Sequence, residues 1–319
     1  MCAHVGRMPS ESLAPISQTL RPLLPHTFVR DIVGSEAKMA ADAMEPSDVL
    51  LLENLRQHRG ETENDDAFAQ ALANFGDFYV NDAFSVSHRA HASIVGVPRH
   101  IPAAAGILFC DELDNLSKAL APTSPSVVVI GGAKFETKEP LIRKMLGIYD
   151  RVFVGGAIAN DLLKARGFPV GRSIISAGMP GAEVLHHPKL MIPSDVVVER
   201  EDGQANVKKV SDVLSGDKIV DIGPDSFADI ARVIRSARFV LWNGPTGLYE
   251  SGYDEWTQAV AQAIAGSGAH TIVGGGNTLA AISALGIEDK FTFVSTAGGA
   301  MLEFLAGTIL PGITALEQS

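Results

Sequence analysis

Five glycine-rich turns in this chain have the residue types and spacing that phosphate binding needs. In each of them an apolar, strand-like run stops at the glycines and a helical pattern follows. A glycine turn at a helix N-terminus presents unpaired backbone N–H groups and the positive end of the helix dipole, and both attract anions. Glycine also serves as a neutral bend, so one such turn is weak evidence. The turns are residues 130–134, 154–158, 242–247, 273–278 and 295–300.

Five turns at the same end of successive strands predict one shared site. The carboxyl ends of parallel strands face one crevice, which is where open α/β sheets bind ligands. Lys134 and Lys138 follow the first turn with i, i+4 spacing, so both can face one phosphate chain, although a solvated helix face is the alternative. The GxxxxGK[ST] loop is absent. The pattern therefore favours a nucleotide site of another kind.

Basic residues in the first third of the chain form a second candidate group. Arginine forks suit carboxylate and phosphate groups, so a converging set would bind a small anionic metabolite. Surface ion pairs and partly buried histidine rings are the alternatives. The residues are Arg7, Arg56 and Arg89, with His4, His88 and His91 beside them.

The elements that must position these residues form two α/β halves. In the first half, residues 27–29, 48–56 and 77–84 are predicted strands and residues 65–75 a helix. Residues 112–125 are predicted to be a helix that ends in a proline-broken loop between domains. The second half alternates apolar runs with helix-length segments, which predicts a parallel sheet covered on both faces. Its runs are SVVVIGG, RVFVGG, KLMIPSDVVVE, KIVDIG, RFVLWNG, HTIVGGG and FTFVST.

Composition limits the function classes. A chain of 319 residues with 46% hydrophobic and 20% charged residues has the material for two domains with cores. The formal net charge of -11 opposes binding to nucleic acid. The two cysteines suggest no disulfide framework, and no apolar run has the length of a signal or membrane segment. We expect a cytoplasmic protein that binds neither nucleic acid nor membrane.

The motifs that these residues belong to resemble phosphoglycerate kinase motifs, in that family's order and spacing and over almost the whole chain. The matching strings are LLENLR, DFYVNDAFSVSHRAHAS, IGGAKFETK, VGGAIANDLLKARG, IPSDVVV, DIGPDS, LWNGPTGLYE, IVGGGNTLAAI and VSTAGGAMLEFLAG.

The resemblance implies two doubly wound, Rossmann-like parallel-sheet domains joined by a hinge helix. Residues 1–111 would form an N-terminal 3-phosphoglycerate-binding domain that lacks its first strands, with the tail 307–319 packing back on it. Residues 112–125 would be the hinge helix and linker, and residues 126–306 the nucleotide-binding domain. Closure at the hinge would exclude water from the reaction.

The implied activity is the reversible transfer of the acyl phosphate of 1,3-bisphosphoglycerate to MgADP, which gives 3-phosphoglycerate and ATP. The partners would be these small molecules with Mg²⁺, and the protein a monomer. The enzyme's task would be to position the reactants and to neutralise charge on the transferred group.

The resemblance also assigns roles to residues of this chain. Lys134, Gly276, Gly298 and Gly299 would be catalytic, and His4, Arg7, Arg56 and Arg89 would bind 3-phosphoglycerate. Asn277 would be the metal ligand. The nucleotide-binding residues would be Gly132, Ala133, Lys134, Lys138, Gly155, Gly156, Gly223, Asn243, Pro245, Glu250, Gly274, Gly275, Gly276 and Thr278.

Several positions depart from the family pattern. The family's opening strand with its DFNVP motif and a following arginine, a transition-state contact, have no counterpart. Asn277 replaces an aspartate that helps to hold Mg²⁺, so we expect weaker metal binding. Ala157 and Ala297 replace glycines, and their methyl groups are expected to hinder close approach or to demand an unfavourable φ.

Three hypotheses follow. The chain is a phosphoglycerate kinase whose given start lies too late, or a short paralogue that binds nucleotide without efficient turnover. The third hypothesis, a nicotinamide-dependent oxidoreductase, ranks far lower because the GxGxxG fingerprint is absent.

Overall fold

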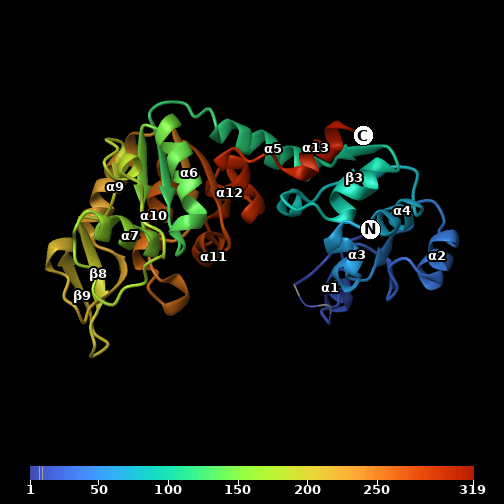
Figure 1. Cartoon of the computed structure of the whole chain (residues 1–319), viewed down its shortest axis with the longest axis horizontal. Coiled ribbons are helices and arrows are strands. Elements are labelled where there is room, and N and C mark those ends of the chain that lie inside the picture. Colours follow the sequence, from blue (N-terminus) through green and yellow to red (C-terminus); the bar gives the residue numbers. More distant parts are fainter. Residues whose placement is uncertain (7, 9) are drawn as a thin grey trace. The chain divides into compact units, whose positions relative to one another are not determined.

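The structure is a computed structural model that describes residues 1–6, 8 and 10–319. The chain divides into two compact units: unit 1 comprises Met1–Cys110 and Ile309–Ser319, and unit 2 comprises Asp111–Thr308. The C-terminal helix α13 (Pro311–Glu317) therefore belongs to unit 1, where it packs against the helical turn η3 (Ala92–Gly96) (Figure 1). Within the described residues, no single helix is long and apolar enough to span a bilayer.

A six-stranded sheet forms the centre of unit 2, and all neighbouring strands in it are parallel. Its two central strands, β5 and β11, are buried at every residue. Burial on both faces explains why these segments are continuous apolar runs. In spatial order, the strands are β13 (Phe293–Ser295), β12 (His270–Gly274), β11 (Phe239–Asn243), β5 (Ser126–Ile130), β6 (Arg151–Val154) and β7 (Leu190–Met191).

Helices connect these strands and cover the sheet (Figure 1). Ile230 of α9, Val260 of α10 and Ile282 of α11 share one hydrophobic core with Val240 and Val273 of the sheet. Helices α6 and α12 pack against each other. The helices are α5 (Ile107–Ala119), which includes the boundary between the units, α6 (Phe135–Ile148), α7 (Ala157–Ala165), α8 (Ala182–Leu185), α9 (Pro224–Ser236), α10 (Glu255–Ala265), α11 (Gly276–Leu285) and α12 (Gly299–Ala306).

Three further strands of unit 2 form a separate antiparallel sheet in the order β10-β8-β9. They are β8 (Asp195–Glu199), β9 (Ala205–Lys209) and β10 (Lys218–Ile222). The apolar pattern predicted that β8 and β10 would join the parallel sheet, and this prediction is wrong. A short loop with Gly203 at a φ of +80° joins β8 directly to β9, and a hairpin of this kind pairs its strands antiparallel. β9 is polar and mostly exposed, so it carries no apolar signal.

The four named strands of unit 1 form two separate parallel pairs. β1 (Thr27–Val29) pairs with β2 (Leu50–Leu52), and β3 (Tyr79–Asn81) pairs with β4 (Ala103–Ala105). Residues 1–3 lie along β2, because the Leu52 and Leu55 N–H groups donate to the Met1 and Ala3 carbonyls, each over 3.1 Å. The predicted strands are confirmed, but β2 and β3 are shorter than expected.

Asn54 is the reason that β2 ends early. Its side chain is fully buried, and its Oδ1 accepts from the Arg56 N–H over 3.2 Å and so begins the helical turn η1 (Leu55–Gln57). Its Nδ2 donates to the carbonyls of Val5 and Glu11 over 3.0 and 2.8 Å. The remaining helices of unit 1 are α1 (Ala14–Leu20), α2 (Ser35–Asp42), α3 (Arg59–Glu63) and α4 (Asp66–Ala73).

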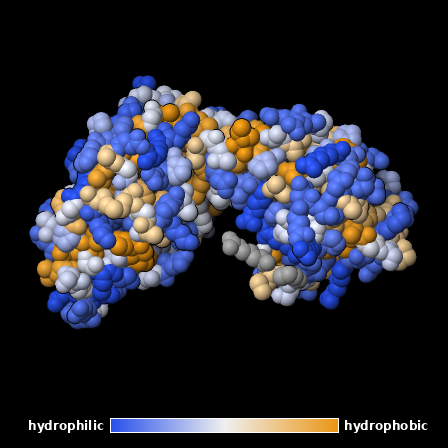
Figure 2. All heavy atoms as spheres, in the orientation of Figure 1, coloured by the Kyte–Doolittle hydropathy of each residue, from blue (hydrophilic) through white to orange (hydrophobic). Residues whose placement is uncertain are grey.

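A groove of about 600 Å³ lies between the first residues of the chain and β3. Met1, Leu72, Phe75 and Val80 are among its mostly apolar lining residues. Val80 of β3 is 55% exposed, and Figure 2 shows other apolar residues at the surface of both units. The two strand pairs of unit 1 thus face an apolar groove instead of forming one continuous sheet.

Candidate functional site

The five glycine turns follow five neighbouring strands of the parallel sheet, namely β13, β12, β11, β5 and β6. Parallel strands end at the same edge of a sheet, so the predicted common location of the turns is confirmed. Each turn contains one glycine with a positive φ, a conformation that strains a side chain. These glycines are Gly132, Gly156, Gly244, Gly275 and Gly298.

The turns after β5 and β11 meet backbone to backbone. A Cβ atom on Gly131 would lie 1.9 Å from the Pro245 carbonyl oxygen, so this position requires glycine. The Gly131 N–H donates to the Asn243 carbonyl over 2.9 Å. The strand order reverses here, because β6 lies on one side of β5 and β11 on the other. Open α/β sheets bind ligands at such a switch point.

Lys138 lies at this switch point, in the first turn of α6. It is 9% exposed, and its Nζ donates to Asn243 Oδ1 over 2.5 Å. Burial lowers the pKa of Lys138 to about 8. None of the ion pairs in the described part of the chain involves Lys138. A buried ammonium without a carboxylate partner is suited to bind an anion.

Two buried polar side chains hold the turns together. Asn243 accepts from Lys138 and directs its Nδ2 toward Met301 Sδ at 3.7 Å. Thr278 is fully buried, and its Oγ1 accepts from the Gly244 N–H over 2.8 Å. The turns after β5, β11 and β12 are therefore linked by side chains as well as by the sheet.

The structure brings most of the predicted nucleotide and catalytic residues to this edge, although their roles stay a prediction. Lys134 is exposed and immediately precedes α6, beside Ala133. Glu250 lies in the helical turn η6 (Tyr249–Ser251) after the β11 turn. The others in or directly after the five turns are Gly132, Lys138, Gly155, Gly156, Asn243, Pro245, Gly274, Gly275, Gly276, Thr278, Gly298 and Gly299.

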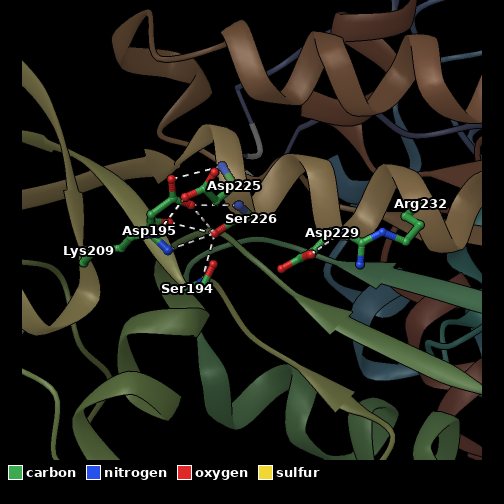
Figure 3. A network of polar contacts seen from close by, with 7 residues as sticks. All are labelled: Ser194, Asp195, Lys209, Asp225, Ser226, Asp229 and Arg232. Atoms are coloured by element: carbon green, nitrogen blue, oxygen red, sulfur yellow. Dashed lines mark hydrogen bonds and ion pairs between the residues drawn. The ribbon is translucent and has the colours of Figure 1, made fainter.

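Gly223 is placed differently, because it follows β10 of the antiparallel sheet and precedes α9. The N-terminus of α9 already holds an internal anion, the buried Asp195 carboxylate (Figure 3). Asp195 accepts from the backbone N–H groups of Asp225 and Ser226 over 3.0 and 2.7 Å, and from Ser226 Oγ over 2.6 Å. A Cβ on Gly223 would meet this carboxylate at 2.3 Å. The helix end at Gly223 is thus satisfied from within the protein.

Asn277, the predicted metal ligand, lies in the first turn of α11, and its Nδ2 donates to Glu250 Oε1 over 3.1 Å. An aspartate at this position would repel that carboxylate. No cluster of three or more His, Cys, Asp or Glu side chains suited to a metal occurs among the described residues. Mg²⁺ prefers charged oxygens and usually keeps water and substrate-phosphate ligands. The Asn277 amide oxygen therefore fits Mg²⁺ as one weak ligand beside phosphate oxygens.

The expected strain at Ala157 and Ala297 is absent. The glycines with positive φ are the preceding Gly156 and the following Gly298. Among the described residues, the non-glycine positions with positive φ are Ser47 and Asn64. Ala157 begins α7 and is 6% exposed, and Ala297 is 1% exposed, so both methyl groups pack inside the protein.

In unit 1, the structure brings part of the predicted basic group together. The His4 and His91 rings lie 6.3 Å apart, edge to face. Burial and the nearby Arg56 charge lower the pKa of His4. The Arg56 guanidinium donates to the Gly6 carbonyl, and Arg89 Nε donates to His88 Nε2 over 3.2 Å. Arg7 lies outside the described residues.

Sequence reasoning missed three buried carboxyl groups near these sites. Glu61 lies beside His91, Asp221 lies against Gly247 of the β11 turn, and Glu112 anchors the turn before α12. Glu112 accepts from Ser295 Oγ over 2.8 Å and from the Thr296 N–H over 2.7 Å. Burial raises the pKa of Asp221 to about 7. Glu61 and Glu112 lie in segments without a distinctive local pattern, and Asp221 begins the DIGPDS string, which by itself assigns no role to this carboxyl. The residues that each of the three contacts here are distant in sequence.

Comparisons with known proteins agree with this geometry. The family model described as "Phosphoglycerate kinase" matches residues 1–308. A phosphoglycerate kinase of Moorella thermoacetica is 42% identical over 337 residues, which cover 100% of this chain and 86% of the relative. One of Solibacter usitatus is 43% identical over 335 residues, which cover 100% of this chain and 85% of the relative.

Solved structures give the same result. The phosphoglycerate kinase of Coxiella burnetii has a TM-score of 0.84 at 38% identity and covers 99% of this chain, with 85% of its own chain matched. That of Pyrococcus horikoshii OT3 has a TM-score of 0.86 at 30% identity and covers 98% of this chain, again with 85% of its own chain matched.

Proposed function

This chain belongs to the phosphoglycerate kinase family, and we propose that it transfers the acyl phosphate of 1,3-bisphosphoglycerate to ADP, reversibly, giving 3-phosphoglycerate and ATP. The observation that carries the proposal is the Lys138 ammonium, which is buried at the switch point and unpaired with any carboxylate of the described residues. Its charge is compensated when the phosphates of a nucleotide bind there.

In this proposal the glycine turns of unit 2 bind the nucleotide. The helix α6 presents its N-terminus beside Lys134 and Lys138, while α11 and α12 begin at the glycine turns after β12 and β13. Backbone N–H groups and ammonium groups fixed in this way need no reorganisation when charge develops on the transferred phosphoryl oxygens. Lys134 and the turn at Gly298 and Gly299 are the groups to which we assign this stabilisation.

Mg²⁺ would enter with the nucleotide and neutralise charge on its phosphate oxygens. Asn277 would contribute its amide oxygen, and Glu250 is held beside it by the Asn277 amide. In direct transfer between two bound substrates, no covalent bond to the protein forms. The task left to the protein's own residues is to position the two reactants and to exclude water.

We assign 3-phosphoglycerate to unit 1, where His4 and Arg56 influence one another electrostatically and Arg89 and Arg7 complete the predicted set. Residues 112–125 remain the proposed hinge and linker, and residues 126–306 the proposed nucleotide domain. We further propose a cytoplasmic monomer that acts on small molecules and binds neither nucleic acid nor membrane.

One observation favours the alternative function, nucleotide binding without efficient turnover. The Asn277 amide donates to Glu250, and a neutral amide is a weaker Mg²⁺ ligand than a carboxylate. The variant N277D places an acidic side chain at this position. It should bind Mg²⁺ more strongly than the wild type, although its carboxylate is also repelled by Glu250.

The test is turnover by the purified chain. Phosphorus NMR follows ATP consumption with 3-phosphoglycerate present, and a reaction without 3-phosphoglycerate is the control. We expect ATP consumption that depends on 3-phosphoglycerate and exceeds this control, at a rate below the usual kinase range of roughly 1–100 s⁻¹ because the transition-state arginine has no counterpart in the tested chain. Nucleotide binding without turnover would support the alternative function, and loss of both would contradict both.

A further inference from the structure

Glu61 is a buried carboxylate for which the proposed function has no use. Its side chain is fully excluded from solvent in the short helix α3. Ser93 supplies two donors, its N–H to Oε2 over 2.9 Å and its Oγ to Oε1 over 2.6 Å. Burial raises the pKa of Glu61, but interactions with His91 and Ser93 outweigh burial and hold the pKa below its usual value. The protein therefore keeps an ionised carboxylate in its interior.

The carboxylate faces a histidine of the predicted basic group. His91 Nδ1 lies 3.6 Å from Glu61 Oε1, an ion-pair distance, and His91 is 8% exposed. A lone pair on Nδ1 would be repelled by the carboxylate, so the favoured ring carries a proton on Nδ1. The other ring nitrogen, Nε2, then points away from Glu61.

The remaining members of the group continue outward from His91. The His4 ring lies 6.3 Å from the His91 ring, and the Arg56 charge acts on His4 in turn. Glu61 thus lies at the inner end of this group, and a small anion that the group binds would lie beside His91, His4 and Arg56. An imidazole that carries a proton on each nitrogen can donate to two acceptors on opposite sides of the ring.

We propose that Glu61 is a positioning residue for anion binding by unit 1: it fixes His91 with Nδ1–H turned inward, so that Nε2–H donates to the bound anion. The inference rests on the proposed function for the identity of the anion, 3-phosphoglycerate. A merely structural role, in which Glu61 only fastens Ser93, is the competing explanation.

Glu61→Gln tests the proposal, because glutamine keeps the shape and one of the two acceptors for Ser93 but removes the charge. We expect the KM for 3-phosphoglycerate to rise about tenfold, the worth of one charge-assisted hydrogen bond, with kcat within about twofold and the KM for ATP unchanged. Long-range ¹H–¹⁵N spectra of the wild type with 3-phosphoglycerate should show both His91 nitrogens protonated, and those of E61Q should not. Unchanged spectra and an unchanged KM would overturn the proposal.

Ser93→Ala is the matched control. It removes a hydrogen bond to the same carboxylate but keeps the charge beside His91, so it should lower stability and leave the His91 spectrum intact. A double-mutant cycle with His91→Gln adds a second readout, since E61Q should have no further effect on 3-phosphoglycerate affinity once His91 is gone. An equal effect in both backgrounds would show that Glu61 does not act through His91.

The histidine spectra also separate this inference from the proposed function. If the His91 spectrum of the wild type responds to 3-phosphoglycerate, that of E61Q does not, and the wild type shows no turnover, the proposed kinase activity fails and the role of Glu61 stands. If turnover is normal and E61Q matches the wild type in both readouts, the role of Glu61 fails and the kinase activity stands.

Discussion

Unit 2 and unit 1 differ in how they position their candidate binding residues. In unit 2, one six-stranded parallel sheet brings five glycine turns to a single edge, and Asn243 and Thr278 connect the turns. In unit 1, four named strands form two separate pairs beside an apolar groove, and buried polar side chains such as Asn54 and Glu61 hold the basic residues. A continuous sheet fixes backbone groups, whereas a divided one relies on side-chain networks.

The largest expected difference between the units comes from glycine replacement. Gly131→Ala in unit 2 places a methyl group against the Pro245 carbonyl, where a Cβ would lie at 1.9 Å. We expect a loss of about 3 kcal/mol in the free energy of unfolding from the overpacking. We also expect a loss of nucleotide affinity on the order of 100-fold, because the turn is displaced. Urea unfolding and nucleotide titration measure the two effects.

Gly76→Ala in unit 1 is the matched control. A Cβ there would meet the Phe78 carbonyl oxygen at 3.8 Å, an ordinary contact. Its effect should stay within about 0.5 kcal/mol, as for surface substitutions. Equal effects of the two variants would remove the basis of the comparison, since the turns of unit 2 would then tolerate side chains.

A smaller effect should follow from the opposite environments of two buried carboxyls. Burial raises the pKa of Asp221 in unit 2 from 3.8 to about 7. The carboxyl therefore loses its proton at a lower pH in the unfolded state than in the folded state, and the free energy of unfolding falls as pH rises from about 4 to 7. Asp221→Asn should match the wild type at pH 4 and be more stable by about 2 kcal/mol at pH 8. Tryptophan fluorescence reports this, because both tryptophans lie in unit 2.

Glu61 in unit 1 should behave in the opposite way. Its folded-state pKa lies below 4.5, so its contribution is present above pH 4.5 and is lost as pH falls through the folded value. Glu61→Gln should therefore lower stability at neutral pH, whereas Asp221→Asn raises it. If D221N is instead less stable than the wild type at pH 8, hydrogen bonds and not burial determine how the Asp221 carboxyl affects stability.

The sequence predicted the carboxyl edge of unit 2 because the signal is local: each apolar run stops at its own glycines. It did not predict that β8 and β10 leave the parallel sheet, since a buried apolar run is compatible with either sheet and the partner strand β9 is polar. Side-chain partners distant in sequence were also missed. Asp195 caps α9 from 30 residues away, and Asn277 donates to Glu250 from 27 residues away. Such pairs depend on tertiary packing, which no local pattern records.

The most direct test of the central claim, a preformed anion site at Lys138, is calorimetric titration with ADP at pH 8.5 in two buffers of different ionisation enthalpy. Because burial lowers the pKa of Lys138 to about 8, the free protein is partly deprotonated there, and phosphate binding should take up a proton. Lys138→Met should abolish the proton uptake and weaken ADP binding about 100-fold, or about 2.7 kcal/mol. Equal affinity and equal proton uptake in K138M and the wild type would contradict the claim.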